Sequence, residues 1–117
     1  MILKLSVGSL QQMKAVLAAL HLYRLPKDQW KRLYVVCEEW FTNCLKYGGK
    51  PKCWIRYQCY RNSPVVCLID NGDAFNPFAK HDRALGLRLM TKLLKAKYRR
   101  FAGKNVFEVC LERVDER

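Results

Sequence analysis

The chain has 117 residues, half of them hydrophobic, and this size suits a single domain over residues 1–117 with one core. Its longest apolar runs fall far short of the roughly 18 residues that cross a bilayer, and its start lacks a cleavable leader, so we expect a cytoplasmic protein without a membrane partner. The formal net charge of +12 is compatible with nucleic acid, an anionic membrane surface or an acidic protein as partner, and charge alone does not choose among them. No nucleic-acid-binding motif accompanies that charge, so we expect a solvated basic surface and no nucleic-acid partner.

The first half of the chain predicts one strand and two helices. Residues 1–7 alternate between apolar and polar side chains, which is typical of an edge strand. Apolar residues then recur at helical spacing over residues 9–22, with Ser9 placed to cap the helix. A second, longer helix begins near Asp28 and ends at Gly48. It is apolar on more than one side, which indicates a central position in the fold.

The second half predicts two hairpins with a helix between them. Residues 52–60 alternate as a strand, and a turn leads to the apolar run of residues 65–69, which is typical of a strand inside a sheet. A third helix is expected over residues 83–95, followed by strands 97–101 and 105–112 joined by a short loop. This order implies the α+β class, as a two-layer sandwich with helices packed on one mixed, mostly antiparallel sheet.

Six cysteines fall at apolar positions of the expected helices and strands. They are Cys37, Cys44, Cys53, Cys59, Cys67 and Cys110. A structural zinc site would need a close cysteine pair beside a second pair or histidines, and neither histidine lies near such a pair. We therefore expect reduced thiols in the core, without a disulfide framework or a structural zinc ion.

Glu39 and Asn43 are the first polar residues that suggest chemistry. They are four residues apart on the long helix, so their side chains lie on one face, one turn from each other. Taken alone, the pair also fits a polar stripe on the exposed side of the helix.

Asp70 marks a second candidate position, because it ends the apolar strand and opens a loop. Gly72 follows it and permits close approach of a ligand to the backbone. A carboxylate at this place can accept a hydrogen bond from an exocyclic amine, while Phe75 closes the apolar side. The start of the next expected helix, at residues 84–87, offers backbone N–H groups and a positive dipole end to phosphates.

These features stand in an order that resembles the Bergerat ATP-binding superfamily, in the form seen in anti-sigma factor serine kinases. The matching segments are residues 38–48 for the N box, 70–77 and 83–90 for the two glycine boxes, and 98–100 with 103–105 for the closing hairpin. The resemblance runs from about Leu25 to Leu111, so it covers nearly the whole domain.

The resemblance implies a role for each of these residues. Asn43 would ligate Mg²⁺ bound to the phosphates of ATP, and Glu39 would be the general base for the attacking hydroxyl. Asp70 would bind the adenine amino group, and Gly72 would clear space beneath the base. The residues expected to complete the nucleotide site are Lys46, Phe75, Arg83, Leu85, Gly86 and Leu87.

The implied activity is transfer of the γ-phosphate of ATP to a serine of an anti-anti-sigma (STAS-like) partner, which regulates a sigma factor. Family members commonly dimerise, so a homodimer is also expected. The alternative is an interaction module that binds a sigma factor or an antagonist without phosphorylation. The short segment between Pro77 and Arg83, where a lid would lie, favours the module. The joint presence of Glu39, Asn43 and Asp70 favours the kinase.

Overall fold

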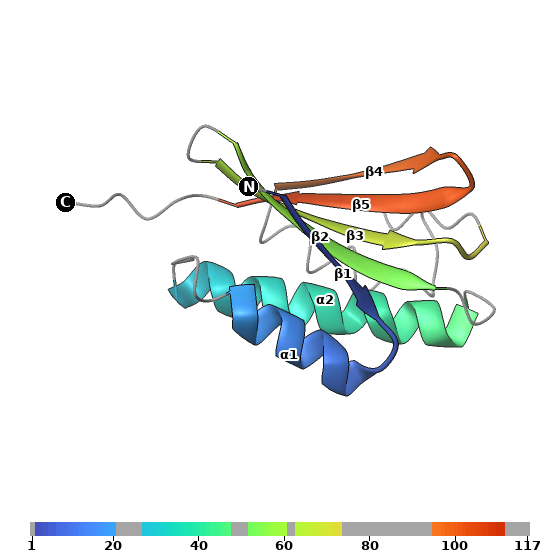
Figure 1. Cartoon of the computed structure of the whole chain (residues 1–117), viewed down its shortest axis with the longest axis horizontal. Helices are drawn as coiled ribbons and strands as arrows, with labels where there is room; N and C mark the ends of the chain where they lie inside the picture. Colours follow the sequence, from blue (N-terminus) through green and yellow to red (C-terminus); the bar gives the residue numbers. More distant parts are fainter. Residues whose placement is uncertain (1, 21–26, 48–51, 61–62, 74–94, 112–117) are drawn as a thin grey trace.

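The described part of the chain forms two layers, a sheet and a pair of helices that lie against one face of it (Figure 1). The computed structural model describes residues 2–20, 27–47, 52–60, 63–73 and 95–111. In these parts of the chain the elements are β1 (Ile2–Val7), α1 (Leu10–Leu20), α2 (Lys27–Tyr47), β2 (Cys53–Tyr60), β3 (Ser63–Asp70), β4 (Lys95–Phe101) and β5 (Lys104–Cys110). The two-layer α+β sandwich expected from the sequence is confirmed. Neither described helix combines the length and the apolar composition needed to cross a bilayer.

The strands pair in the order β1-β2-β3-β5-β4, and every pairing between described strands is antiparallel. The sequence predicts a mixed, mostly antiparallel sheet, and the described strands contain no parallel pair. The connection between β1 and β2 explains why these two strands are antiparallel. Two successive helices, α1 and α2, return the chain to the end of the sheet where β1 stops, with Val7 opposite Cys53. A crossover through a single helix would have placed β2 parallel to β1.

Two strands begin two residues earlier than expected. β3 begins at Ser63 and not at residue 65, and so includes Pro64. Proline has no N–H to donate, but its carbonyl here accepts a hydrogen bond from the backbone N of Leu111 at 2.9 Å, which anchors this end of the strand. β4 begins at Lys95, inside the range expected for a third helix, and the rest of that expected helix lies outside the described residues.

The main core lies between the helices and the sheet. Alternate strand residues face the helices, and Ile55, Leu68 and Phe107 stand opposite one another in neighbouring strands. The α2 residues in this core are Leu33, Val36, Cys37, Trp40, Phe41 and Cys44. Their spacing follows the helical repeat, and each large apolar side chain so buried contributes about 1.5–3 kcal/mol. The central position expected for the long helix is confirmed.

A smaller apolar cluster lies on the opposite face of the sheet. It consists of Cys67, Ile69 and Val106, with Trp54 and Val65 packed against it. Neither of the described helices covers this face (Figure 1).

The described cysteine side chains occupy packing positions and are reduced. Those of Cys37, Cys44, Cys53 and Cys67 are buried, and that of Cys110 is half-buried. The expectation of reduced core thiols is therefore confirmed for the four buried residues. The side chain of Cys59 lies outside the described ones.

Candidate functional site

Asp70 is the last residue of β3, a strand with a neighbour on each side. Its position places it opposite Cys53 at the start of β2 and opposite Asn105 near the start of β5. The side chain is turned toward the helices and is 5% exposed. A carboxylate this deeply buried needs hydrogen-bond donors around it, because desolvation otherwise penalises the charge.

The two carboxylate oxygens of Asp70 have unequal partners. Oδ1 accepts hydrogen bonds from the backbone N of Gly72 and from Nδ2 of Asn105, both at 2.9 Å. Among the described residues, Oδ2 is approached by the thiol of Cys44 at 3.5 Å. A thiol is a weak donor, so Oδ2 keeps the capacity to accept a stronger hydrogen bond from a ligand.

Cys44 joins α2 to this carboxylate. Hydrogen bonding to Cys53, burial and the nearby Asp70 carboxylate all raise the pKa of the Cys44 thiol. The sulfur therefore stays protonated at neutral pH and donates to Asp70, because a thiolate would repel the carboxylate. Through this contact the turn of α2 that contains Asn43 and Cys44 is held close to the end of β3.

Asn43 is 6% exposed, and its Nδ2 has no hydrogen-bond partner among the described residues. An unsatisfied buried N–H group costs about 1–3 kcal/mol, and a phosphate oxygen is an acceptor that would satisfy it. Mg²⁺ takes oxygen ligands and keeps several waters, so one carboxamide oxygen from the protein beside phosphate oxygens is a suitable donor set. The residue present therefore fits a Mg²⁺–nucleotide complex. Glu39 is half-buried one turn earlier on α2.

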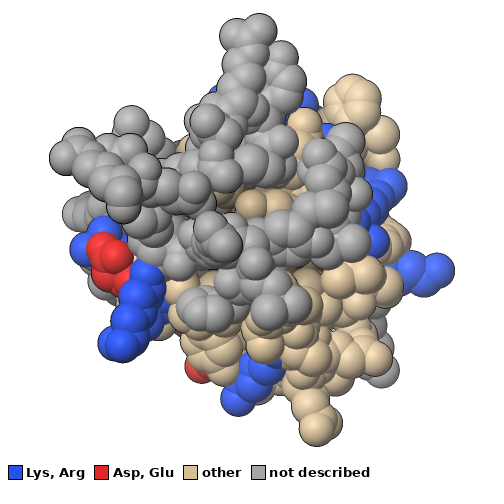
Figure 2. Space-filling view, turned by 60° about the vertical axis from the view of Figure 1, so that its left-hand side comes forward, with Lys and Arg blue, Asp and Glu red and all other residues tan. Residues whose placement is uncertain are grey.

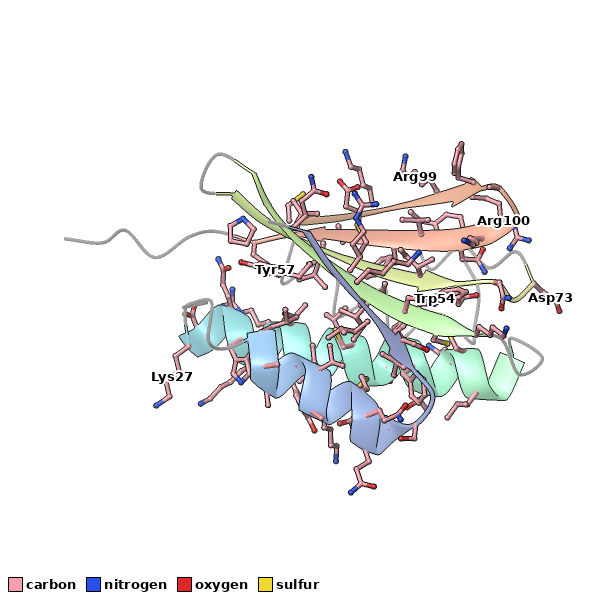
Figure 3. The ribbon with its side chains drawn as sticks, in the orientation of Figure 1. Lys27, Trp54, Tyr57, Asp73, Arg99 and Arg100 are labelled. Carbon is pink, nitrogen blue, oxygen red and sulfur yellow. The ribbon has the colours of Figure 1, made fainter. Side chains whose placement is uncertain are left out.

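The loop after β3 is tied to its surroundings on both sides. On one side, Oδ1 of Asn71 accepts a hydrogen bond from the backbone N of Lys52 at 2.7 Å. On the other, Nη1 of Arg100 donates to the carbonyl of Gly72 at 2.8 Å, and Nδ2 of Asn105 donates to the carbonyl of Asp73 at 2.8 Å. Figure 3 places Arg100 and Asp73 at the same end of the sheet. The loop that begins at Asp70 is thus fixed by strands distant from it in sequence.

The structure brings together only some of the residues singled out from the sequence. Gly72 donates to Asp70 at the end of β3, Cys44 of α2 contacts the same carboxylate, and Asn43 and Glu39 lie on that helix, Asn43 next to Cys44. Lys46 lies near the end of α2, and its side chain is not among the described ones. The residues predicted for the site that lie outside the described part of the chain are Phe75, Arg83, Leu85, Gly86 and Leu87.

Sequence reasoning did not assign roles to four residues that contact the site. These are Cys44, Tyr98, Arg100 and Asn105. Asn105 had a detectable signal, since a carboxamide at the start of the apolar stretch of β5 is unusual for a strand inside a sheet. Cys44 had none, because its position fits core packing equally well.

Several solved structures resemble this fold, whereas no protein-family model and no curated protein sequence matches the chain. The Erythrobacter litoralis EL346 blue-light activated histidine kinase aligns with a TM-score of 0.61 and 13% identity, over 92% of this chain and 42% of that chain. The Acinetobacter baumannii histidine kinase AdeS aligns with a TM-score of 0.59 and 14% identity, over 97% of this chain and 68% of that chain. The chain thus spans less than half of the first protein. It has a fold that also occurs within these two histidine kinases.

Proposed function

We propose that this chain binds ATP with Mg²⁺ where α2 meets the end of β3, and that it is a protein serine kinase of the anti-sigma factor type. The observation that carries the proposal is the buried Asp70 carboxylate. Its Oδ1 is occupied by two N–H donors, while Oδ2 has just a thiol beside it among the described residues. An acceptor held rigidly in this way suits the exocyclic amine of adenine.

The proposed chemistry assigns one task to each of two residues on α2. Asn43 would supply an oxygen ligand to Mg²⁺, which neutralises phosphate charge when it is bound with ATP. Glu39 takes the proton of the attacking serine hydroxyl, and the hydroxyl oxygen forms the new bond to the γ-phosphorus as the bond to ADP breaks. Both residues lie on one face of α2, one turn apart, which supports their acting on one nucleotide.

The proposed acceptor is a serine of an anti-anti-sigma (STAS-like) domain, with regulation of a sigma factor as the result. This part of the proposal rests on the N box, glycine boxes and closing hairpin in the sequence. The fold shared with the two histidine kinases is compatible with a serine acceptor as well as with a histidine acceptor. A module that binds a sigma factor or an antagonist without phosphorylation is the competing function.

Asp70→Asn tests the nucleotide site with little change in shape. The carboxamide oxygen can still accept from Gly72 and Asn105, so the fold should survive, but an N–H donor would now face the adenine amine. We expect calorimetric titration with ADP to show at least a tenfold loss of affinity. Asp73→Asn is the matched control. The Asp73 side chain is exposed, and the change keeps the backbone carbonyl that accepts a hydrogen bond from Asn105. Equal affinity of wild type and Asp70→Asn would reject the adenine site.

A further inference from the structure

The face of the sheet that points away from the helices carries a group of positive charges. Lys4 on β1, Arg56 on β2, Lys97 and Arg99 on β4 and Lys104 on β5 occupy it, and we name these five residues the outer basic face. Figure 3 shows Arg99 projecting from β4 away from the helices, whereas Tyr57 lies between the sheet and the helices. In Figure 2 the described surface carries more blue, from lysine and arginine, than red.

Negative charge does not balance this face. The strands contain two carboxylates, and Asp70 faces the helices, so Glu108 alone among the described strand residues offsets the five cations. Glu108 pairs with Lys97 at 3.7 Å, and the Lys97 side chain is 75% exposed. The described part of this face therefore keeps an excess of four positive charges, five minus one.

The antiparallel register sets the positions of these charges. Lys4 stands opposite Arg56 at the β1 edge, and Arg99 stands opposite Val106 at the β4 edge. The edges are four strand spacings apart, roughly 19 Å, with the apolar residues Ile69 and Val106 between them. In the sequence these cations are scattered from residue 4 to residue 104, and the sheet alone brings them to one surface.

Aromatic rings accompany the charges. The Nζ atoms of Lys4 and Lys104 each lie 5.2 Å from the centroid of the Trp54 ring. Cation–π attraction holds two like charges near one ring, and phosphate groups bound beside them would offset their repulsion. Phe101, at the β4 edge and next but one to Arg99, is 69% exposed.

The chemistry of the face selects among anionic partners. Cys67, Ile69 and Val106 are only 6–7% exposed, so little apolar area remains for a protein or a membrane to cover. The cores of protein interfaces are also depleted in lysine. A flat sheet does not enter the major groove of a duplex, which admits a helix or a two-stranded ribbon. Basic side chains beside an exposed aromatic ring, here Phe101, are the features that bind single strands, through phosphates and stacked bases.

We propose that the outer basic face binds single-stranded nucleic acid, with its lysines and arginines on phosphates and with Phe101 against a base. This proposal departs from the sequence expectation of no nucleic-acid partner, because that expectation rested on the absence of a binding motif, whereas the register of the sheet gathers charges that are scattered in the sequence. It is independent of the nucleotide site, which lies on the helix side of the sheet.

The test is fluorescence anisotropy with a labelled 12-nucleotide oligouridylate between 50 and 200 mM salt. We expect wild type to bind it with an affinity that falls steeply with salt. Lys4→Glu with Arg99→Glu should weaken binding at least tenfold and reduce the salt slope. Lys14→Glu with Lys31→Glu is the matched control, because it changes the net charge equally at exposed positions of α1 and α2. The control should change affinity less than about twofold.

Phe101→Ala supplies a second variant that the fold tolerates, since the side chain is 69% exposed. Loss of a stacked base predicts a roughly 5- to 150-fold weaker complex. Equal losses in the two charge-reversal variants would overturn the proposal, as would no effect of Phe101→Ala. Competition by polyglutamate or by a duplex of equal length, as effective as that by the unlabelled single strand, would also overturn it. ADP titration of each variant confirms that the helix side of the sheet is unchanged.

Discussion

The side-chain amide of Asn105 donates a hydrogen bond to Oδ1 of Asp70 at 2.9 Å, between opposite residues of β3 and β5. The same nitrogen donates to the carbonyl of Asp73, and Oδ1 of Asn105 accepts from the hydroxyl of Tyr98 at 2.6 Å and from Nη1 of Arg100 at 3.0 Å. Both amide protons and both lone pairs are therefore used. This arrangement fixes the orientation of the carboxylate that we propose to bind adenine.

Asn105→Ala should loosen Asp70 and its loop together. The change leaves Oδ1 of Asp70 with Gly72 as its donor and removes the acceptor of Tyr98, so we expect a loss of about 1–3 kcal/mol in the free energy of unfolding. ADP affinity should fall roughly tenfold. Urea unfolding and calorimetry measure the two effects.

Tyr98→Phe is the control for that change. It removes one hydrogen bond to Asn105 but leaves the contact with Asp70 intact, so we expect about 1 kcal/mol lower stability with ADP affinity nearly unchanged. Asn105→Asp should be worse than Asn105→Ala for ADP, because it places a carboxylate against Asp70. If Asn105→Ala and Tyr98→Phe had the same ADP affinity, Asn105 would be a structural residue without a positioning role.

The sequence predicts those parts of the fold and of the site that depend on interactions between residues close together in the chain. The alternation in residues 52–60 and the apolar spacing in α2 predict their elements, since each depends on neighbours in the chain. Asp70 also stands out locally, as a carboxylate that ends an apolar run. Asn105 is noticeable as a carboxamide at the start of an apolar stretch, but its role cannot be predicted, because its partner lies 35 residues away and is defined by the register of β3 with β5. The outer basic face is missed for the same reason, since a register gathers charges that the sequence scatters.

The buried thiols predict an alkaline decline in stability. Burial raises the pKa of Cys37 and is the first cause of the raised pKa of Cys67, whereas in the unfolded chain both titrate near 9. The unfolded state therefore loses protons first as pH rises. The contribution of these thiols to the free energy of unfolding is fully present below about pH 8 and declines above pH 9, by up to about 1.4 kcal/mol per pH unit for each thiol.

Urea unfolding between pH 7 and 10.5 measures this decline. Cys37→Ala is the comparison, because it removes one titrating thiol while every lysine and tyrosine remains. We expect the variant to be less stable at pH 7 and to show a shallower decline above pH 9. Parallel curves for wild type and variant would mean that Cys37 titrates alike in both states.

The β4–β5 turn offers a test of backbone strain. Ala102 has φ of 52° and Gly103 has φ of 74°, and two left-handed residues between paired strands are typical of a type I′ turn. Ala102→Gly should stabilise the fold by about 1 kcal/mol, because glycine adopts this conformation without steric cost. Gly103→Ala should destabilise it by a similar amount, although an added Cβ would meet no atom within 4 Å. Thermal unfolding of both variants should give shifts of opposite sign.

Glu39 and Asn43 separate a kinase from an interaction module. Glu39→Gln keeps the size of the side chain but cannot take a proton, so ATP should bind as before while phosphoryl transfer slows by roughly 10²- to 10⁴-fold. Asn43→Ala removes the proposed metal ligand, so it should weaken Mg²⁺-dependent nucleotide binding as well as transfer. It also removes a buried amide with no described partner, so the fold should tolerate the change.

The assay is phosphate incorporation into a candidate STAS-like domain, measured beside nucleotide titration. Glu38→Gln is the control, because Glu38 is exposed at the adjacent position of α2. If wild type binds ATP but transfers no phosphate to any candidate, the chain is an interaction module; if Glu38→Gln and Glu39→Gln slow transfer alike, Glu39 is not the base.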